Sequence, residues 1–268
     1  MREREVYPNP PIVLMVAEVR HTACEPLDRK QVTRLSELVR EELPLPGEEV
    51  SYEVQFSSDG APQPPYAVTT APRWTTRDRR TALTIRQESL TVETTQYGSY
   101  ERVRALLELS LRARIAVAPP AGLERVGLRY VDEIRVPTET GSGWPPWNEW
   151  VDSALLGPAG IGEDLGLEPA AYQGSVVFSS GDDRAIVLRY GAQENPVVQS
   201  TPDLRRPMPP PGPLFKLDID SFWLPGSEVP EFASDSILAC ADSLHEPVRG
   251  VFESLITNRL REEVLRHG

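Results

Sequence analysis

The spacing of apolar residues changes along this chain in an order that occurs twice, and that order limits the folds open to it. Strands place apolar residues at alternate positions, whereas helices place them at three- and four-residue intervals. Within residues 1–120 the pattern predicts strands at 11–20, 50–56, 66–74, 81–86 and 90–95, and helices at 27–43 and from Ser99 to just before Pro119. Within residues 121–268 it predicts strands at 126–134, 174–178, 185–190, 196–200 and 214–222, a short helix at 148–156 and a long helical region from Phe232.

This order predicts an α+β fold built from two β-α-β-β-β(-β)-α halves, residues 1–120 and 121–268. Paired edge to edge, the halves would form one globular unit with a curved antiparallel sheet and the helices on one face. Such an arrangement resembles the TATA-binding-protein-like folds, or two helix-grip units. The halves show no residue-level repeat, so only the order of elements is duplicated. Pro247 predicts a kink or break in the last helix.

Charge is distributed unevenly between the two segments. Residues 1–120 carry 16 Lys+Arg and 17 Asp+Glu, whereas residues 121–268 carry 12 and 23, so nearly all of the net charge of −12 belongs to the second segment. A polyanion is therefore not expected as the primary ligand, because binding phosphates needs a concentrated basic surface. The acidic segment is either a solvated face or a docking surface for a basic partner.

Cellular context is predicted from what the sequence lacks. Cys24 and Cys240 do not form a disulfide framework and have no zinc-ligand spacing around them. We find neither an apolar run of about 18 residues, which a membrane span needs, nor the pattern of a signal peptide. A cytoplasmic protein without membrane association is the expectation.

No sequence motif identifies an enzyme or a cofactor. The chain has no phosphate-binding glycine loop and no Gly-x-Ser-x-Gly elbow, so we predict no catalytic residues, no cofactor and no metal. The candidates that remain are binding residues. They are Arg129, Asp132, Trp144, Trp147, Asp218, Asp220 and His245.

The first candidates lie on one predicted strand. Because side chains alternate between faces, Arg129 shares a face with Glu133, and Asp132 lies on the other face. Arg129 either forms an ion pair with Glu133 or lines a binding concavity. Four tryptophans are candidates for an apolar cavity that Arg129 would anchor; these are Trp144, Trp147, Trp150 and Trp223.

The remaining candidates come from the last strand and helix. Asp218 and Asp220 share a face, where they either bind a metal or transfer protons, or are simply solvated. His245 lies on the apolar stripe of the last helix, either as a core histidine or as a buried polar switch beside Asp218 or Asp220. The proline-rich segment 202–213 is predicted as a polyproline-II loop, for recognition or as plain surface.

Several short motifs, in the same order along nearly the whole chain, resemble a known family. They are NPPI at 9–12, GLRYVDEI at 127–134, LDID at 217–220, LH at 244–245, FE at 252–253 and IT at 256–257. The chain resembles a sporadically distributed, uncharacterised bacterial family of about 250 residues. The resemblance implies a link to mobile elements, toxin–antitoxin pairs or defence islands, and it implies no catalytic residues. Asp132 departs from the family, which usually has Asn there.

Three functions follow from these features. The first is a non-enzymatic interaction protein, such as an antitoxin or a defence-associated subunit, whose protein partner is encoded by a neighbouring gene. The alternative is a small-molecule-binding protein or enzyme of helix-grip type, with a pocket between the sheet and the C-terminal helix. The third, nucleic-acid binding through a saddle-shaped sheet, is opposed by the negative charge.

Overall fold

The protein is described by a computed structural model that covers residues 7–56, 62–137, 144–157, 161, 166–167 and 171–267, with the backbone alone for the part of 51–68 in these ranges. Nine strands form one antiparallel sheet in the described chain, in the order β2-β3-β4-β5-β1-β6-β9-β8-β7. The strands are β1 (Ile12–His21), β2 (Leu45–Phe56), β3 (Pro62–Thr75), β4 (Thr81–Ile85), β5 (Ser89–Thr94), β6 (Leu123–Ile134), β7 (Tyr172–Gly181), β8 (Arg184–Gln193) and β9 (Leu214–Trp223). The predicted α+β class with a large antiparallel sheet is confirmed.

The centre of the sheet is the pair β1 and β6, which joins residues far apart in the sequence. Met15 lies opposite Tyr130 and Val19 lies opposite Val126. On its other side β1 pairs with β5, and β6 pairs with β9. The sheet is therefore continuous across residue 120.

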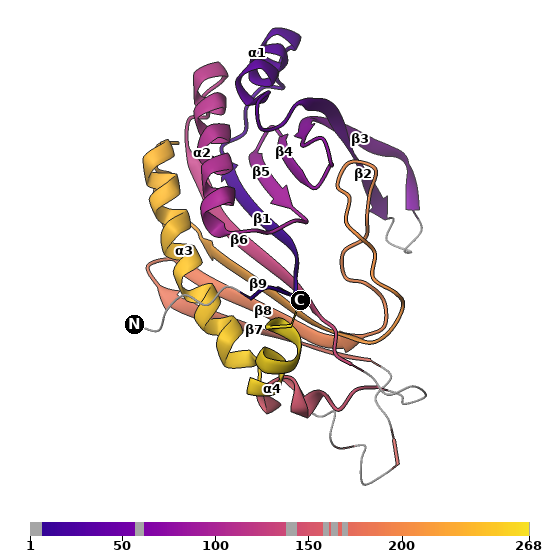
Figure 1. Cartoon of the computed structure of the whole chain (residues 1–268). Coiled ribbons are helices and arrows are strands. Elements are labelled where there is room, and N and C mark those ends of the chain that lie inside the picture. The colour runs from indigo at the N-terminus through magenta and orange to yellow at the C-terminus, as the bar shows by residue number, and fades with distance from the viewer. Residues whose placement is uncertain are drawn as a thin grey trace.

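The long helices α1 (Arg29–Val39), α2 (Tyr100–Val117) and α3 (Ser234–Leu255) lie on one side of this sheet (Figure 1). Their starts follow from capping residues. Asp28 forms a capping box with Gln31 before α1, and Ser99 accepts a hydrogen bond from the Arg102 backbone N–H, as predicted for α2. The short helix α4 (Asn258–Leu260) and a π-helical turn, Arg261–Leu265, follow α3.

Three local predictions differ from the structure. The expected helix at 148–156 is two 3₁₀ turns, η1 (Trp147–Glu149) and η2 (Ser153–Leu155), because the Asp152 side chain caps Ala154 and starts a new turn. The expected strand at 196–200 lies in a loop. The break expected at Pro247 is absent, because α3 continues through the proline while its buried stripe packs against the core on both sides.

The core lies between the sheet and the helices. Alternate residues of the central strands point into it, among them Met15, Leu128 and Ile219, and all are buried against the helical layer. The α3 helix is also tied to β9 by a hydrogen bond, because the Ser221 hydroxyl donates to the Leu244 carbonyl over 2.9 Å. The other face of the sheet, called the open face below, carries charged side chains instead.

Candidate functional site

Ion pairs between neighbouring strands dominate the open face. Arg129 of β6 binds Asp218 of β9 through two hydrogen bonds, Nε to Oδ1 at 2.8 Å and Nη2 to Oδ2 at 2.7 Å. The hydrogen bond to Asp218 raises the pKa of Arg129, so the guanidinium stays charged. The predicted partner of Arg129 is therefore wrong, since Glu133 contacts a different arginine.

Asp220 forms an ion pair with a second arginine, Arg125. Arg125 donates from Nη2 to Asp220 Oδ1 over 3.0 Å and from Nη1 to Glu18 Oε2 over 2.6 Å, with its guanidinium 4.9 Å from the Phe222 ring centre. Asp218 and Asp220 do share a face, as predicted, but each carboxylate is already paired with a guanidinium. Within the described residues no group of three acidic, histidine or cysteine side chains is arranged to hold a metal ion.

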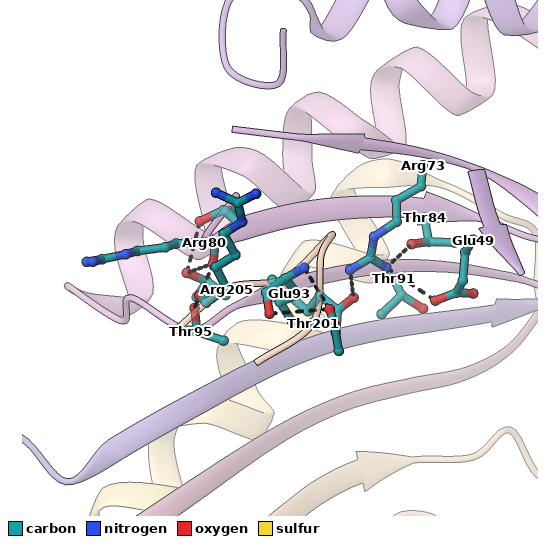
Figure 2. Close-up of polar contacts among 12 residues, drawn as sticks. Glu49, Arg73, Arg80, Thr84, Thr91, Glu93, Thr95, Thr201 and Arg205 are labelled. Atoms are coloured by element: carbon teal, nitrogen blue, oxygen red, sulfur yellow. Dashed lines mark hydrogen bonds and ion pairs between the residues drawn. The ribbon is translucent and has the colours of Figure 1, made fainter. Parts of the chain in front are cut away.

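A third cluster surrounds Arg73 of β3. Its guanidinium lies 2.6 Å from Glu93 and 3.2 Å from Glu49, and it donates to the Thr84 hydroxyl over 2.8 Å. Figure 2 shows Arg73 pointing between the two carboxylates, which come from β5 and β2. The open face is thus a set of charges that neutralise one another. The described part of this face offers no concentrated basic surface for a polyanion.

Residues 194–213, called the β8–β9 loop, run on the open-face side of the sheet (Figure 1). Arg206 binds both oxygens of Glu133, at 2.8 and 2.9 Å, and the two side chains are only 6% and 1% exposed. The backbone N–H groups of Val197 and Val198 donate to the same carboxylate. Burial raises the pKa of Glu133, but these bonds outweigh it and hold the pKa below its usual range.

The middle of the β8–β9 loop is fixed to the turn between β3 and β4 and to the residue that follows β5. The Arg205 N–H donates to the Arg79 carbonyl over 2.7 Å, and the Thr95 hydroxyl donates to the Arg205 carbonyl over 2.5 Å. Figure 2 shows Arg205 and Thr95 facing one another there. These contacts hold the front of the proline-rich segment 202–213, and at its other end the Arg135 guanidinium donates to the Gly212 carbonyl over 3.2 Å.

His245 lies on the helical side of the sheet, away from Asp218 and Asp220. Its Nδ1 is 2.9 Å from the Tyr130 hydroxyl, and its ring stacks on Tyr100 with centres 3.9 Å apart. The predicted switch beside Asp218 or Asp220 is wrong, because β9 directs those side chains to the opposite face. The alternative, a core histidine with hydrogen-bonding partners, agrees with these contacts.

Asp132 is a buried carboxyl on the helical face of β6. It is 2% exposed, and its Oδ1 has no hydrogen-bond partner among the described residues. Burial, with a smaller effect from the charge of Asp218, raises the pKa of Asp132 to about 8. The sequence pattern correctly assigned Asp132 and Arg129 to different faces of β6. It did not indicate that the Asp132 carboxyl would have a raised pKa.

The tryptophans do not share a pocket with Arg129. Trp147 and Trp150 are buried in the core, where Trp147 packs on Phe215 with ring centres 5.4 Å apart, and Trp144 is packed partly buried against the same core. Arg129 projects from the opposite face of the sheet, so it is not an anchor for them. Cavities of about 1150, 480 and 200 Å³ lie elsewhere, and none of the seven predicted residues lines them.

The edge strand β7 is a candidate binding surface that the sequence did not suggest. It pairs only with β8 within the described chain, and Figure 1 shows it at the border of the sheet. Val177 is 65% exposed and Phe178 is 48% exposed, so both faces of this strand present apolar side chains to solvent. Its sequence, YQGSVVFSSG, contains no charged residue and no proline. The lack of any charged residue in this strand was the one feature of the sequence that could have indicated such a surface.

Comparison of the chain with protein-family models and with curated proteins found no match. None of the helices in the described residues has the length and apolar character needed to cross a bilayer.

Proposed function

We propose that this chain is a non-enzymatic interaction protein that binds a protein partner by adding the partner's strand to β7. The observation that carries the proposal is the exposed, uncharged edge of β7, centred on Val177 and Phe178. An edge strand presents unpaired backbone N–H and C=O groups, which an extended segment of another chain can pair with. Apolar side chains on both faces would add burial to those hydrogen bonds.

The strand at the other edge of the sheet, β2, has features that protect an edge from pairing, and β7 lacks them. The edge strand β2 contains Pro46 and the acidic residues Glu48, Glu49 and Glu53. Proline and charge are the features by which soluble proteins prevent unwanted pairing at sheet edges. The β7 strand has neither, although a long uncharged edge with exposed valine and phenylalanine favours aggregation when nothing covers it.

Charge indicates the kind of partner. Residues 121–268, to which β7 belongs, carry a net charge of −11, from 12 Lys+Arg and 23 Asp+Glu. Asp182 and Asp183 are exposed at the turn that ends β7. A partner strand with apolar residues at its centre and basic residues beside it would complement both features. The family resemblance supports an antitoxin or a defence-associated subunit, with the partner encoded by a neighbouring gene.

The order of strands supports a finer proposal about the fold. We infer that the sheet is a TATA-binding-protein-like saddle of two halves, residues 1–120 and 121–268. Outward from the central pair, β1 is followed by β5, β4, β3 and β2, and β6 is followed by β9, β8 and β7. In both segments the last strand in sequence therefore lies beside the first strand. The second segment has one strand fewer, and 3₁₀ turns stand where the first segment has α1. The paired charges of the open face still oppose nucleic acid as its ligand.

A second candidate function rests on one cavity. The cavity of about 480 Å³ lies between α1, α2 and β5 and is lined partly by apolar side chains, among them Leu38, Leu43 and Leu106. Its size is that of a small-molecule site. A ligand that raises the melting temperature, and loses this effect in Leu106→Trp, would favour the helix-grip alternative.

Co-expression tests the partner-binding function directly. The chain is produced with the products of the genes on either side, and the complex is isolated through a tag on the neighbour. We expect a stable complex for the wild type and at least a tenfold weaker one for Val177→Lys, since a central charge in a buried strand pair costs about 1–3 kcal/mol or more. Val50→Lys is the matched control, because Val50 is a 46% exposed valine on the opposite edge strand.

The result can contradict the proposal in three ways. The wild type stays alone with both neighbours; both lysine variants weaken the complex equally; or the isolated chain forms a dimer that Val177→Lys dissolves. In the last case the occupant of β7 is a second copy of the chain, and the proposed partner is wrong.

A further inference from the structure

Arg114, near the end of α2, is a buried cation without a counter-ion. The residue is 1% exposed, and no carboxylate of the described chain forms an ion pair with it. Its Nη1 donates to the Ala118 carbonyl, and its buried Nε has no hydrogen-bond partner among the described residues. Two other well-buried arginines differ, since Arg73 and Arg206 each bind carboxylates. A buried charge is costly unless it is paired, so the Arg114 guanidinium lacks an anion.

Arg114 lies on the wall of the largest of the three cavities described above. This cavity, of about 1150 Å³, is formed by β1, by the loop that leads from β1 to α1, by α1 itself, by β2 and β3, and by the β4–β5 turn. Small-molecule sites have volumes of about 300–1,000 Å³, so the space is sufficient for a ligand of that kind. The unpaired guanidinium therefore lies where a bound molecule can reach it.

The other charges on the cavity wall are of two kinds. Some are neutralised by neighbours, since Glu18 binds Arg20 and Arg125, and Arg86 binds Glu49. The rest are exposed and have no ion-pair partner in the described chain; they are Glu25, Glu48, Glu88 and Arg29. Because carboxylates predominate in this exposed set, the exposed part of the wall favours a cationic group, whereas the buried part favours an anion.

From this geometry we propose that the cavity binds a small zwitterion, a molecule with a carboxylate at one end and an ammonium or guanidinium group at the other. The carboxylate accepts hydrogen bonds from the Arg114 guanidinium, including one from the unpartnered Nε. The planar fork of an arginine fits a carboxylate, and charged hydrogen bonds of this kind are short and strong. The cationic end of the ligand lies at the exposed glutamates. This ligand is distinct from the protein partner proposed for β7.

Three matched probes separate the two ends of such a ligand. The zwitterion ε-aminocaproate carries both charges, caproate lacks the ammonium group, and hexylamine lacks the carboxylate. Each probe is titrated into the isotope-labelled chain at about pH 7, where carboxylates and amines are both charged, and binding is followed by the amide NMR shifts.

We expect ε-aminocaproate to bind with a dissociation constant on the order of 1 mM or below. The shifts should include Gln87 and Ser89, which lie on the cavity wall. Caproate and hexylamine should each bind at least about tenfold more weakly, because each lacks one of the two charged contacts.

Variants of the chain test the same contacts from the protein side. Arg114→Gln should weaken the binding of ε-aminocaproate at least about tenfold and leave that of hexylamine unchanged. Replacing the three exposed glutamates together by glutamine should weaken the binding of ε-aminocaproate and leave that of caproate unchanged. Arg112→Gln is the matched control, because the Arg112 side chain lies on the same helix, is 69% exposed and does not line the cavity.

Each outcome decides the matter. The proposal is overturned if ε-aminocaproate does not bind the wild type, or if caproate or hexylamine binds as tightly as ε-aminocaproate. Equal affinity of the wild type and Arg114→Gln also rejects it, and so does an equal loss in Arg112→Gln. If circular dichroism shows that Arg114→Gln is unfolded, the three probes on the wild type and the triple glutamine variant decide.

Discussion

Replacing Asp132 by Asn should stabilise this protein at neutral pH. In the folded chain the carboxyl is buried, its Oδ1 has no partner among the described residues, and its pKa is raised to about 8. In the unfolded chain an Asp has a pKa of about 3.9. Between these values the native state keeps a proton that the unfolded state has released, so the wild-type stability is complete below about pH 4 and falls as the pH rises towards about 8.

The size of the effect follows from the same two values. Each pH unit in this window removes about 1.4 kcal/mol from the free energy of unfolding. At about pH 7 the accumulated loss is about 4 kcal/mol, a large part of the stability of an average domain. An Asn at position 132 does not titrate, so Asp132→Asn avoids this loss.

Urea unfolding of both proteins at about pH 5, 6, 7 and 8 provides the assay. The expected signal is the difference in unfolding free energy between Asp132→Asn and the wild type, which should grow by about 1.4 kcal/mol per pH unit in favour of the variant. Asp182→Asn is the control, because the Asp182 side chain is 91% exposed and its difference should be flat. A flat difference for Asp132→Asn as well would refute the reasoning.

Other contacts give further expectations. Glu133→Gln leaves Arg206 buried without its counter-charge and should lower the unfolding free energy by about 3 kcal/mol, with faster trypsin cleavage of the β8–β9 loop; unchanged cleavage would contradict it. Tyr130→Phe removes the hydrogen bond to His245 and should cost about 1–2 kcal/mol in urea titrations. Trp147→Ala should cost about 3–5 kcal/mol through the cavity it leaves; a cost below about 1 kcal/mol would place Trp147 outside the core.

Local features of the fold could be predicted because they depend on neighbours in sequence. The two-residue period assigned Arg129 and Asp132 to opposite faces of β6, and Ser99 marked the start of α2. Apolar spacing located most strands. The 3₁₀ turns after Pro146 were missed, because the Asp152 side chain accepts a hydrogen bond from the Ala154 N–H and so competes with a continuous helix.

Partners across the sheet could not be predicted, because they depend on strand order. The sequence offered Glu133 as the ion-pair partner of Arg129, but β9 is the neighbour of β6, so Arg129 binds Asp218 and Glu133 binds Arg206. The edge position of β7 could not be predicted either, because it also depends on strand order and the sequence of β7 suits an interior strand as well as an edge strand.

The central pairing of β1 with β6 has a consequence for folding during synthesis on the ribosome. Residue 15 finds its partner at residue 130, so the nascent chain holds β1 unpaired along one side until β6 has left the ribosome. During that interval β5 is the only one of the two neighbouring strands that can pair with β1. Pairings this distant in sequence also slow folding. A chaperone that binds extended apolar segments is therefore expected to bind this chain at β1 before β6 is synthesised.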